Sequence, residues 1–404
     1  MKSTTRLKKI IISGYKSISP DKPVTIELED INILLGANGS GKSNIISLFK
    51  MLNYMVAGSF QLFVEKTGTS QVFLHYGSKH TSAIKGELYF ENNTYDGSYT
   101  FQLTHANPDR LIITSEEIVW GKKSRKITQT LKPHTSFKES ALINNTNPSI
   151  NFIHKILSSC KVYQFHDSSL ESPIRQSSLI DTASYLQAEG NNLASFLYLL
   201  KREHVSDYHK IVSYVKLIMP QFKDFYLEPH GEGRYVMLKW VDSSLNDYVL
   251  SPQQFSDGTI RFIALATLLL QPATMMPKVI IIDELELGLH PYAINQLAEM
   301  IKEAAKHTQI IVATQSPGFV DEFMANQVTI VERDEGNDCT IVNRLKEEQL
   351  EEWLKDYSLS ELWDKNVIGD AHESNTKRTV RRTNRRTFCR QSIKRLLKRY
   401  WNNC

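Results

Sequence analysis

Residues 36–43 read Gly36-Ala37-Asn38-Gly39-Ser40-Gly41-Lys42-Ser43 and fit the pattern G-x-x-x-x-G-K-[ST]. They follow an apolar run at residues 31–35 and precede apolar residues at positions 45, 46, 48, 49 and 52. The run is typical of a strand buried on both faces, and the spacing is typical of a helix. A strand, a glycine-rich loop and a helix in this order predict a phosphate-binding P-loop, in preference to a glycine-rich turn without a ligand.

The loop predicts a site for ATP and Mg²⁺. Its glycines let backbone N–H groups converge on phosphate oxygens, and the following helix adds the positive end of its dipole. Lys42 is expected to reach the β- and γ-phosphates, and the Ser43 hydroxyl is expected to bind Mg²⁺. The residues expected to contact the nucleotide in this loop are Gly36, Ala37, Asn38, Gly39, Ser40, Gly41, Lys42 and Ser43.

A second motif, VIIIDE at residues 279–284, predicts a buried strand that ends in two carboxylates, the Walker B pattern. Asp283 lies at the strand end where ligands of open α/β sheets collect, and it is expected to hold Mg²⁺ directly or through water. Glu284 is expected to be the general base that polarises the attacking water. The alternative is a strand that ends in two solvated acids, and the P-loop upstream favours the functional interpretation.

Strand–helix alternation on both sides of a long middle segment indicates an α/β fold with a largely parallel sheet and an insertion. Within the insertion, strand-like stretches flank Asp96-Gly97 and predict a hairpin-rich segment. The expected division is a P-loop lobe at 1–55, an insertion with β-hairpins and a helical lid at 56–250, a C-terminal lobe at 251–345, a C-terminal helix at 346–370 and a basic tail at 371–404.

The basic character of the chain is confined to this tail. The 404 residues include 48 Lys and Arg against 44 Asp and Glu, a net charge of +4. Residues 371–404 hold eleven Lys or Arg and one acid, so the first 370 residues carry a net charge of −6. The tail interleaves its cations with apolar side chains. It suits an arm on nucleic-acid phosphates or an amphipathic helix on an anionic membrane. A dispensable extension and an altered reading frame are the other interpretations.

Cysteine usage and hydropathy indicate a cytoplasmic protein. The four cysteines are far apart and form no C-x-x-C pair, which disfavours a disulfide framework and a structural zinc site. The longest apolar stretch, residues 262–270, is too short to be a transmembrane segment, and the N-terminus shows no signal-peptide core.

Motifs beyond the P-loop and the Walker B strand narrow the class further. Ser256-Asp257-Gly258-Thr259 opens an apolar helix 27 residues before Asp283, where ABC-type ATPases place their signature loop. The chain thus resembles the RecF/SMC-like branch of ABC-type ATPases. More closely, it is similar to the RecF-like ATPases of bacterial anti-phage systems, including the OLD-like group. The stretches that carry the resemblance are IIISGYKS (10–17), KSN (42–44), FSDGTIRF (255–262), DELELGLHP (283–291) and ATQSP (313–317).

The resemblance implies an ABC/SMC-type P-loop NTPase head with a mixed sheet, an inserted α+β lid and a homodimer formed through ATP. Asn44 would contact the nucleotide as a continuation of the P-loop. The signature residues Ser256, Asp257 and Gly258 would cap the γ-phosphate bound by the other subunit. Residues 286–291 would form the D-loop at the interface.

The resemblance also places Gln315 at the catalytic switch position, which usually holds a histidine. Glutamine cannot take up a proton, so rapid turnover is not expected. Gln71 is a candidate for the glutamine loop, with a surface glutamine as the alternative. Lys16 is a candidate nucleotide contact, with a solvated lysine as the alternative.

The output of such a head depends on its partners. OLD-type nucleases carry a TOPRIM domain after the ATPase, whereas only 90 residues follow Thr314 here, and Asp334 and Asp338 lack the TOPRIM spacing. We therefore expect an ATP-gated switch in anti-phage defence that controls a separate TOPRIM-like nuclease or toxin. The alternatives are a DNA repair or recombination ATPase that clamps DNA, a structural ATP binder, and a transporter subunit, which the signature and the insertion disfavour.

Overall fold

The computed structural model describes residues 5–369 with the exception of 124–127, 133–136, 144, 245 and 335. The basic tail at 371–404 lies outside the described residues. In the described ranges, no helix combines the length and the apolar character that crossing a bilayer requires.

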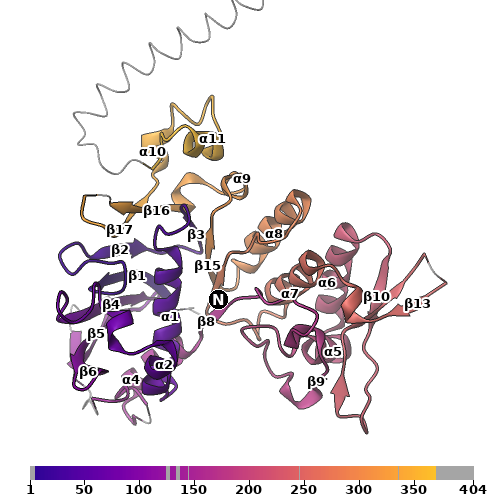
Figure 1. The fold of residues 1–404 in the computed structure, drawn as a ribbon, viewed down its shortest axis with the longest axis horizontal. Coiled ribbons are helices and arrows are strands. Elements are labelled where there is room, and N and C mark those ends of the chain that lie inside the picture. Colours follow the sequence, from indigo (N-terminus) through magenta and orange to yellow (C-terminus); the bar gives the residue numbers. More distant parts are fainter. Residues whose placement is uncertain are drawn as a thin grey trace, which may run out of the picture.

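A six-stranded sheet of order β17-β16-β3-β15-β14-β8 forms the centre of the molecule (Figure 1). Its strands are β3 (Ile31–Leu35), β8 (Cys160–Tyr163), β14 (Val279–Asp283), β15 (Gln309–Thr314), β16 (Val328–Asp334) and β17 (Cys339–Arg344). Neighbouring strands are parallel except for β16 and β17. All residues of β3, β14 and β15 are buried, because both faces of the sheet are covered.

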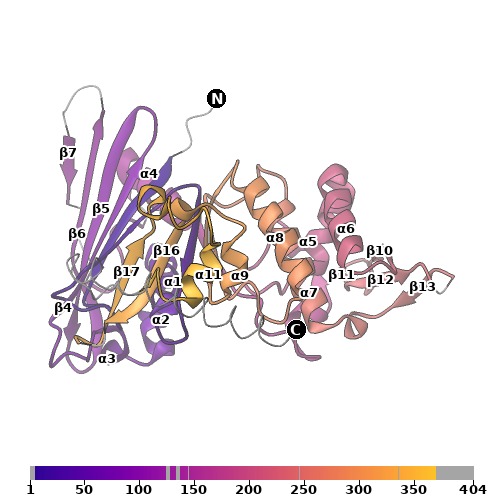
Figure 2. The same ribbon diagram turned by 90° about the horizontal axis from the view of Figure 1, so that it is seen from above.

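A second sheet is antiparallel and has the order β2-β1-β4-β5-β6-β7 (Figure 2). Its strands are β1 (Arg6–Ser13), β2 (Val24–Glu27), β4 (Ala83–Glu91), β5 (Tyr95–Ala106), β6 (Arg110–Lys122) and β7 (Thr128–Leu131). Buried and more accessible residues alternate along β4, so one face of this sheet packs inward and the other faces solvent.

Helix α1 (Lys42–Val56) fills the layer between the two sheets. Its apolar residues share one buried cluster with the antiparallel sheet on one side and with Ile281 and Ile311 of the central sheet on the other. Helices α2 (Phe60–Thr67), α3 (Ser70–Phe73) and α4 (Pro148–Ser158) add to this layer. The P-loop helix is therefore held on both sides by apolar contacts.

The opposite face of the central sheet carries a helical lobe. Ile280 and Ile282 of β14 point into a second buried cluster on this face. Its helices are α5 (Leu193–Glu203), α6 (Val205–Ile218), α7 (Asp257–Leu270), α8 (Pro291–Ala304) and α9 (Pro317–Val320). The lobe extends away from the central sheet (Figure 1) through two small sheets, β10 (Phe222–Tyr226), β12 (Lys239–Asp242) and β13 (Tyr248–Leu250), and β9 (Ser178–Leu179) with β11 (Tyr235–Val236).

The strands divide the segment that the sequence assigns to a single insertion at 56–250. Strands β4 to β7 extend the N-terminal sheet and β8 is an edge strand of the central sheet, so only residues 165–250 of the expected insertion belong to the helical lobe. Strands β4, β5 and β6 pair as consecutive antiparallel hairpins, as expected for this stretch. The turn between β4 and β5 lies at Asn92, whose side chain accepts hydrogen bonds from the backbone N–H groups of Thr94 and Tyr95. Gly97 lies within β5, where Trp120 packs against it.

The single helix expected at 346–370 is replaced by two short ones, α10 (Glu347–Leu350) and α11 (Leu359–Asp364). Ser358 begins the second with a capping box in which its side chain accepts from the Glu361 N–H. This local side-chain bond competes with a continuous helix and explains the break.

Candidate functional site

The P-loop joins β3 to α1 and needs glycine at specific positions. Gly39 and Gly41 have φ values of 79° and 109°, a region that residues with a Cβ rarely adopt. At Gly36 the constraint is space, because a Cβ there would lie 2.3 Å from the Val331 carbonyl oxygen. The loop therefore curves tightly before the N-terminus of α1, where an anion is stabilised.

Lys42 lies folded over its own loop. Its Nζ donates to the carbonyl oxygens of Gly36 at 2.7 Å and of Ala37 at 2.9 Å. Burial lowers the pKa of the Lys42 ammonium, and the charge of Asp283 opposes that shift. The buried Oγ of Ser40 has no hydrogen-bond partner within the described residues. A bound phosphate would offer acceptors to both groups, which fits the nucleotide that the loop predicts.

Asp283 ends β14 beside the P-loop and fits a Mg²⁺ ligand. Its Oδ2 accepts from Gln164 Nε2 at 3.1 Å, whereas its buried Oδ1 has no partner in the described part of the chain. Burial, followed by the charge of Glu284, raises the pKa of the Asp283 carboxyl. A carboxylate oxygen and a serine hydroxyl are the kind of oxygen donors that Mg²⁺ prefers, so Asp283 and Ser43 are the residues that would hold this ion.

A pocket of about 150 Å³ lies between the P-loop and the end of β14. Its lining brings together most of the expected phosphate and catalytic residues: Asn38, Gly39, Gly41, Lys42, Ser43, Asn44, Glu284 and Gln315. Gly36 and Ala37 contact this lining through their carbonyl oxygens, which accept hydrogen bonds from the Lys42 ammonium. The lining includes none of the signature residues Ser256, Asp257 and Gly258. One chain thus supplies the phosphate pocket without the signature contact.

Two polar side chains project into this pocket from the strand ends. Glu284 has a left-handed backbone, with φ of 49°, and its N–H donates to the Ala313 carbonyl at 3.0 Å. This conformation turns the chain sharply after Asp283, and such strained residues cluster at functional sites. Gln315 follows β15, and its N–H donates to Glu286 Oε1 at 2.8 Å. The two side chains can therefore act on the same bound water or phosphate.

The signature loop lies at the start of α7. Ser256 is the exposed N-cap, and its Oγ accepts from the Thr259 N–H at 3.1 Å. Gly258 packs against the D-loop, because a Cβ there would lie 2.4 Å from the Gly288 carbonyl oxygen. His290 caps α8 by accepting from the Tyr292 N–H at 3.3 Å, so it acts as a turn residue. Signature loop and D-loop form one continuous surface.

A larger groove of about 650 Å³ adjoins the phosphate pocket at Asn44. Lys16 lies in it and donates to Ser47 Oγ at 2.9 Å, and burial, with the charge of Lys50, lowers its pKa. Gln71 lines the same groove and exchanges hydrogen bonds with Ser78. The groove has the size and position to receive the nucleoside end of a nucleotide.

Gln164 is the site residue that the sequence reasoning did not assign. It follows β8, which pairs in parallel with β14, and this register carries its amide to the Asp283 carboxylate. Its Oε1 accepts from the Nζ of Lys50, whose pKa is lowered by burial. The sequence does contain a signal for Gln164, because it is a polar residue directly after an apolar strand. The ends of parallel strands meet at one edge of the sheet, where ligands bind.

The fold of this chain is that of solved SMC ATPase heads. The crystal structure of an SMC head bound to the C-terminal winged-helix domain of ScpA aligns with a TM-score of 0.56 at 17% identity, covering 85% of this chain and 99% of that chain. An SMC head with an extended coiled coil, bound to the ScpA C-terminal domain and derived from Pyrococcus furiosus, gives 0.56 at 15% identity, covering 87% and 99%. The P-loop NTPase fold expected from the sequence is confirmed.

The chain belongs to the family described as "AAA domain, putative AbiEii toxin, Type IV TA system", whose model matches residues 31–321. No curated protein matches the sequence. The family and the structural similarity confirm the resemblance to SMC/RecF-like ABC-type ATPases and support an ATPase-type protein.

Proposed function

We propose that the chain is an ATP-hydrolysing dimeric switch that acts in anti-phage defence through a separate nuclease or toxin. The dimer is supported by the observation that one chain brings only part of the expected ATP site together. Lys42, Glu284 and Gln315 line the phosphate pocket, whereas the exposed Ser256 at the N-terminus of α7 does not. In a two-fold dimer, each α7 N-terminus would meet the other subunit's γ-phosphate, which its dipole favours.

In each pocket, water would attack the γ-phosphate of ATP, with Glu284 polarising that water. Lys42 and the P-loop N–H groups would stabilise the charge that develops on the phosphate oxygens. When bound by Ser43 and Asp283, Mg²⁺ supplies further charge neutralisation. Gln315 would orient the water without taking its proton, so we expect slow turnover and a switch governed by ATP occupancy.

The defence role is supported by the family description, which names a putative toxin of a Type IV toxin–antitoxin system. It is also supported by the sequence motifs shared with RecF-like anti-phage ATPases. A head that closes with ATP and opens after hydrolysis can hold and release a partner. We therefore assign the toxic activity to a separate TOPRIM-like nuclease or toxin. A signal that changes ATP occupancy would then trigger its release.

Sedimentation of Glu284→Gln tests the dimer. With ATP and Mg²⁺ this variant should sediment at twice the monomer mass, because the pocket would bind ATP without hydrolysing it. The matched control, Lys42→Ala in the same background, should remain monomeric. Identical sedimentation of Glu284→Gln with and without ATP contradicts the composite site.

Co-purification tests the partner. The chain is tagged in its native locus with neighbouring reading frames intact, and the bound proteins are identified with and without ATP. Retention of a nuclease or toxin encoded nearby supports the proposal. An ATPase that purifies alone and binds DNA only with ATP favours the second candidate, a DNA clamp in repair or recombination.

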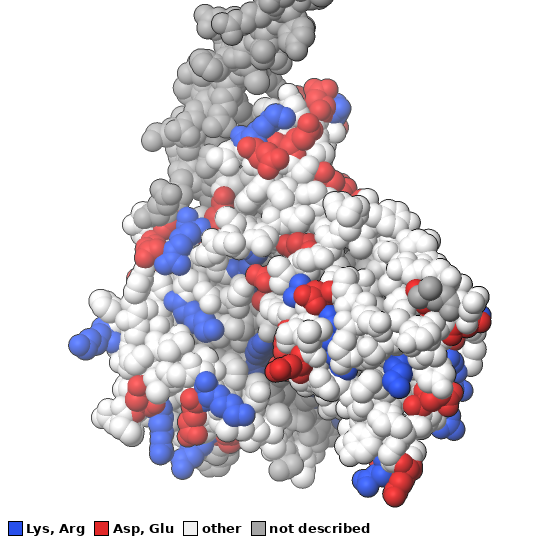
Figure 3. All heavy atoms as spheres, turned by 45° about the vertical axis from the view of Figure 1, so that its right-hand side comes forward, with Lys and Arg blue, Asp and Glu red and all other residues white. Residues whose placement is uncertain are grey.

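Charge argues against the DNA clamp. Residues 1–370 carry a net charge of −6. On the face seen in Figure 3, basic and acidic side chains of the described residues are interspersed. A DNA-binding surface usually concentrates cations on one face. Truncation after Asp370 separates the body from its basic tail: if the tail is a nucleic-acid arm, DNA affinity and its salt dependence fall together.

A further inference from the structure

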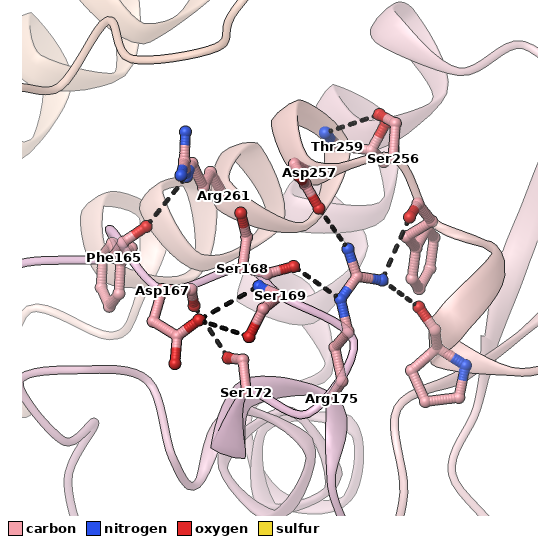
Figure 4. A network of polar contacts seen from close by, with 12 residues as sticks. Phe165, Asp167, Ser168, Ser169, Ser172, Arg175, Ser256, Asp257, Thr259 and Arg261 are labelled. Carbon is pink, nitrogen blue, oxygen red and sulfur yellow. Dashed lines mark hydrogen bonds and ion pairs between the residues drawn. The ribbon is translucent and has the colours of Figure 1, made fainter.

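A buried arginine connects the helical lobe to the signature loop. Arg175 lies in a short 3₁₀ turn, Pro173–Arg175, and its side chain is 1% exposed. Figure 4 shows its guanidinium pointing between the segment that follows β8 and the start of α7. A buried cation is costly unless it is paired and hydrogen-bonded, so its partners indicate what it holds in place.

Three of the four acceptors of Arg175 belong to the signature region. Nη1 donates to the Phe255 carbonyl at 3.0 Å and also to the Pro252 carbonyl. Nη2 donates to Asp257 Oδ1 at 2.8 Å. These acceptors lie on both sides of Ser256, so one rigid guanidinium fixes the backbone before the N-cap and the first turn of the helix after it.

The fourth acceptor leads back toward the phosphate pocket. Arg175 Nε donates to the Ser168 carbonyl at 3.0 Å. From there the chain runs back to Gln164, whose amide contacts Asp283 at 3.1 Å. Arg261 of α7 holds the same segment, because its guanidinium donates to the Phe165 carbonyl at 3.1 Å (Figure 4). It also donates to the His166 carbonyl at 2.6 Å.

The ion pair also changes the charge that an incoming phosphate would meet. The Asp257 carboxylate is 66% exposed and adjoins Ser256 at the N-terminus of α7. An unpaired carboxylate there would repel the γ-phosphate that the proposed function brings to this helix. Arg175 offsets that charge from the buried side and leaves the exposed side open.

We propose that Arg175 is a positioning residue that holds the signature loop ready for the nucleotide of the second subunit, and that residues 164–175 connect this loop to the phosphate pocket of its own subunit. Arg175 is not among the residues that line the phosphate pocket or the adjoining groove, so we expect it to act through Ser256 and Asp257. This inference rests on the proposed composite dimer, and it adds the residue that prepares one half of each site.

The experiment uses the full chain with Glu284→Gln as the parent. Arg175→Ala and Arg175→Lys are compared with Arg202→Ala, the matched control, whose guanidinium is solvent-exposed on α5. Titration of the dilute monomer with fluorescent ATP measures the affinity of the phosphate pocket for ATP. Sedimentation with ATP and Mg²⁺ measures the dimerisation constant. Arg175→Ala should leave ATP affinity within about twofold and weaken dimerisation at least tenfold, about 1.4 kcal/mol. Arg175→Lys should be intermediate, because an ammonium cannot span both carbonyls and Asp257.

Hydrogen exchange over residues 252–259 supplies a readout that does not need the dimer. Arg175→Lys, the milder change, should speed exchange at the Thr259 amide at least fivefold, while Arg202→Ala should not. Unchanged dimerisation and unchanged exchange in Arg175→Lys overturn the inference even where Arg175→Ala fails to fold. Failure of the parent itself to dimerise overturns the composite dimer instead, and the exchange rates still decide whether Arg175 holds the loop.

Discussion

Asp283→Asn should stabilise the nucleotide-free protein while removing its Mg²⁺-dependent nucleotide binding. The Asp283 side chain is buried, its Oδ1 has no partner among the described residues, and burial raises its pKa. The surroundings of this carboxyl therefore disfavour its ionised form. Asparagine removes the charge and keeps an oxygen that can accept from Gln164.

The magnitude follows from the cost of an unsatisfied buried group, about 1–3 kcal/mol. Asparagine recovers only part of it, because its own N–H groups gain no acceptor there. We expect a gain of about 1 kcal/mol, which raises the melting temperature of a chain of 404 residues by about 1 °C. A carboxyl with a raised pKa stabilises the fold below that pKa and loses this contribution as pH rises through it. The advantage of Asp283→Asn should therefore be largest at neutral pH and shrink toward pH 4.

Calorimetry in EDTA without nucleotide, at pH 7.5 and pH 5, measures the difference. Glu284→Gln is the control. The Glu284 side chain is 37% exposed, so the free energy of unfolding should change by no more than about 0.5 kcal/mol. An Asp283→Asn protein that melts at or below the wild-type temperature at pH 7.5 refutes the reasoning, as does an advantage that grows on acidification.

Three further changes test other parts of the site. Lys42→Ala removes the ammonium that spans the Gly36 and Ala37 carbonyls, and fluorescent ATP titration should show at least a ~100-fold loss of affinity; full affinity would contradict the P-loop assignment. Gly258→Ala places a Cβ 2.4 Å from the Gly288 oxygen, so it should impair ATP-driven dimerisation in sedimentation while ATP binding persists. Burial raises the pKa of the Cys160 thiol to about 12, so peptide mapping should find it unmodified by iodoacetamide at pH 8 until the protein unfolds.

The sequence predicts those parts of the site that a short stretch of chain encodes by itself. The P-loop combines an apolar strand, glycines and a helix start within about twenty residues, and Asp283 ends its own apolar run. Gln164 and Arg175 contact residues that lie more than 70 positions away in the sequence. Gln164 contacts Asp283, and Arg175 contacts Pro252, Phe255 and Asp257. Only the parallel register of β8 with β14 and the packing of the lobe bring those partners together.

The same limit explains the hairpin. Asp96-Gly97 is a strong local turn signal, yet the turn forms at Asn92, whose side chain satisfies two backbone N–H groups. Gly97 has a different reason for being glycine, since the Trp120 ring of the neighbouring strand occupies the space of a Cβ. Packing between neighbouring strands sets the register of this hairpin, and a short stretch of sequence does not contain that information.

The order of strands in the central sheet has a consequence for how the chain is made. Strands β1, β2 and β4 to β6 pair among themselves within the first 122 residues, whereas Leu35 of β3 pairs with Thr314 of β15. At ribosomal rates of roughly 5–20 residues per second, the strand that feeds the P-loop waits about 15–55 s for that neighbour. A nascent or prematurely ended chain thus folds its antiparallel sheet first and holds an unsupported nucleotide loop. Nucleotide affinity should therefore appear late and abruptly during synthesis, once the C-terminal third has emerged.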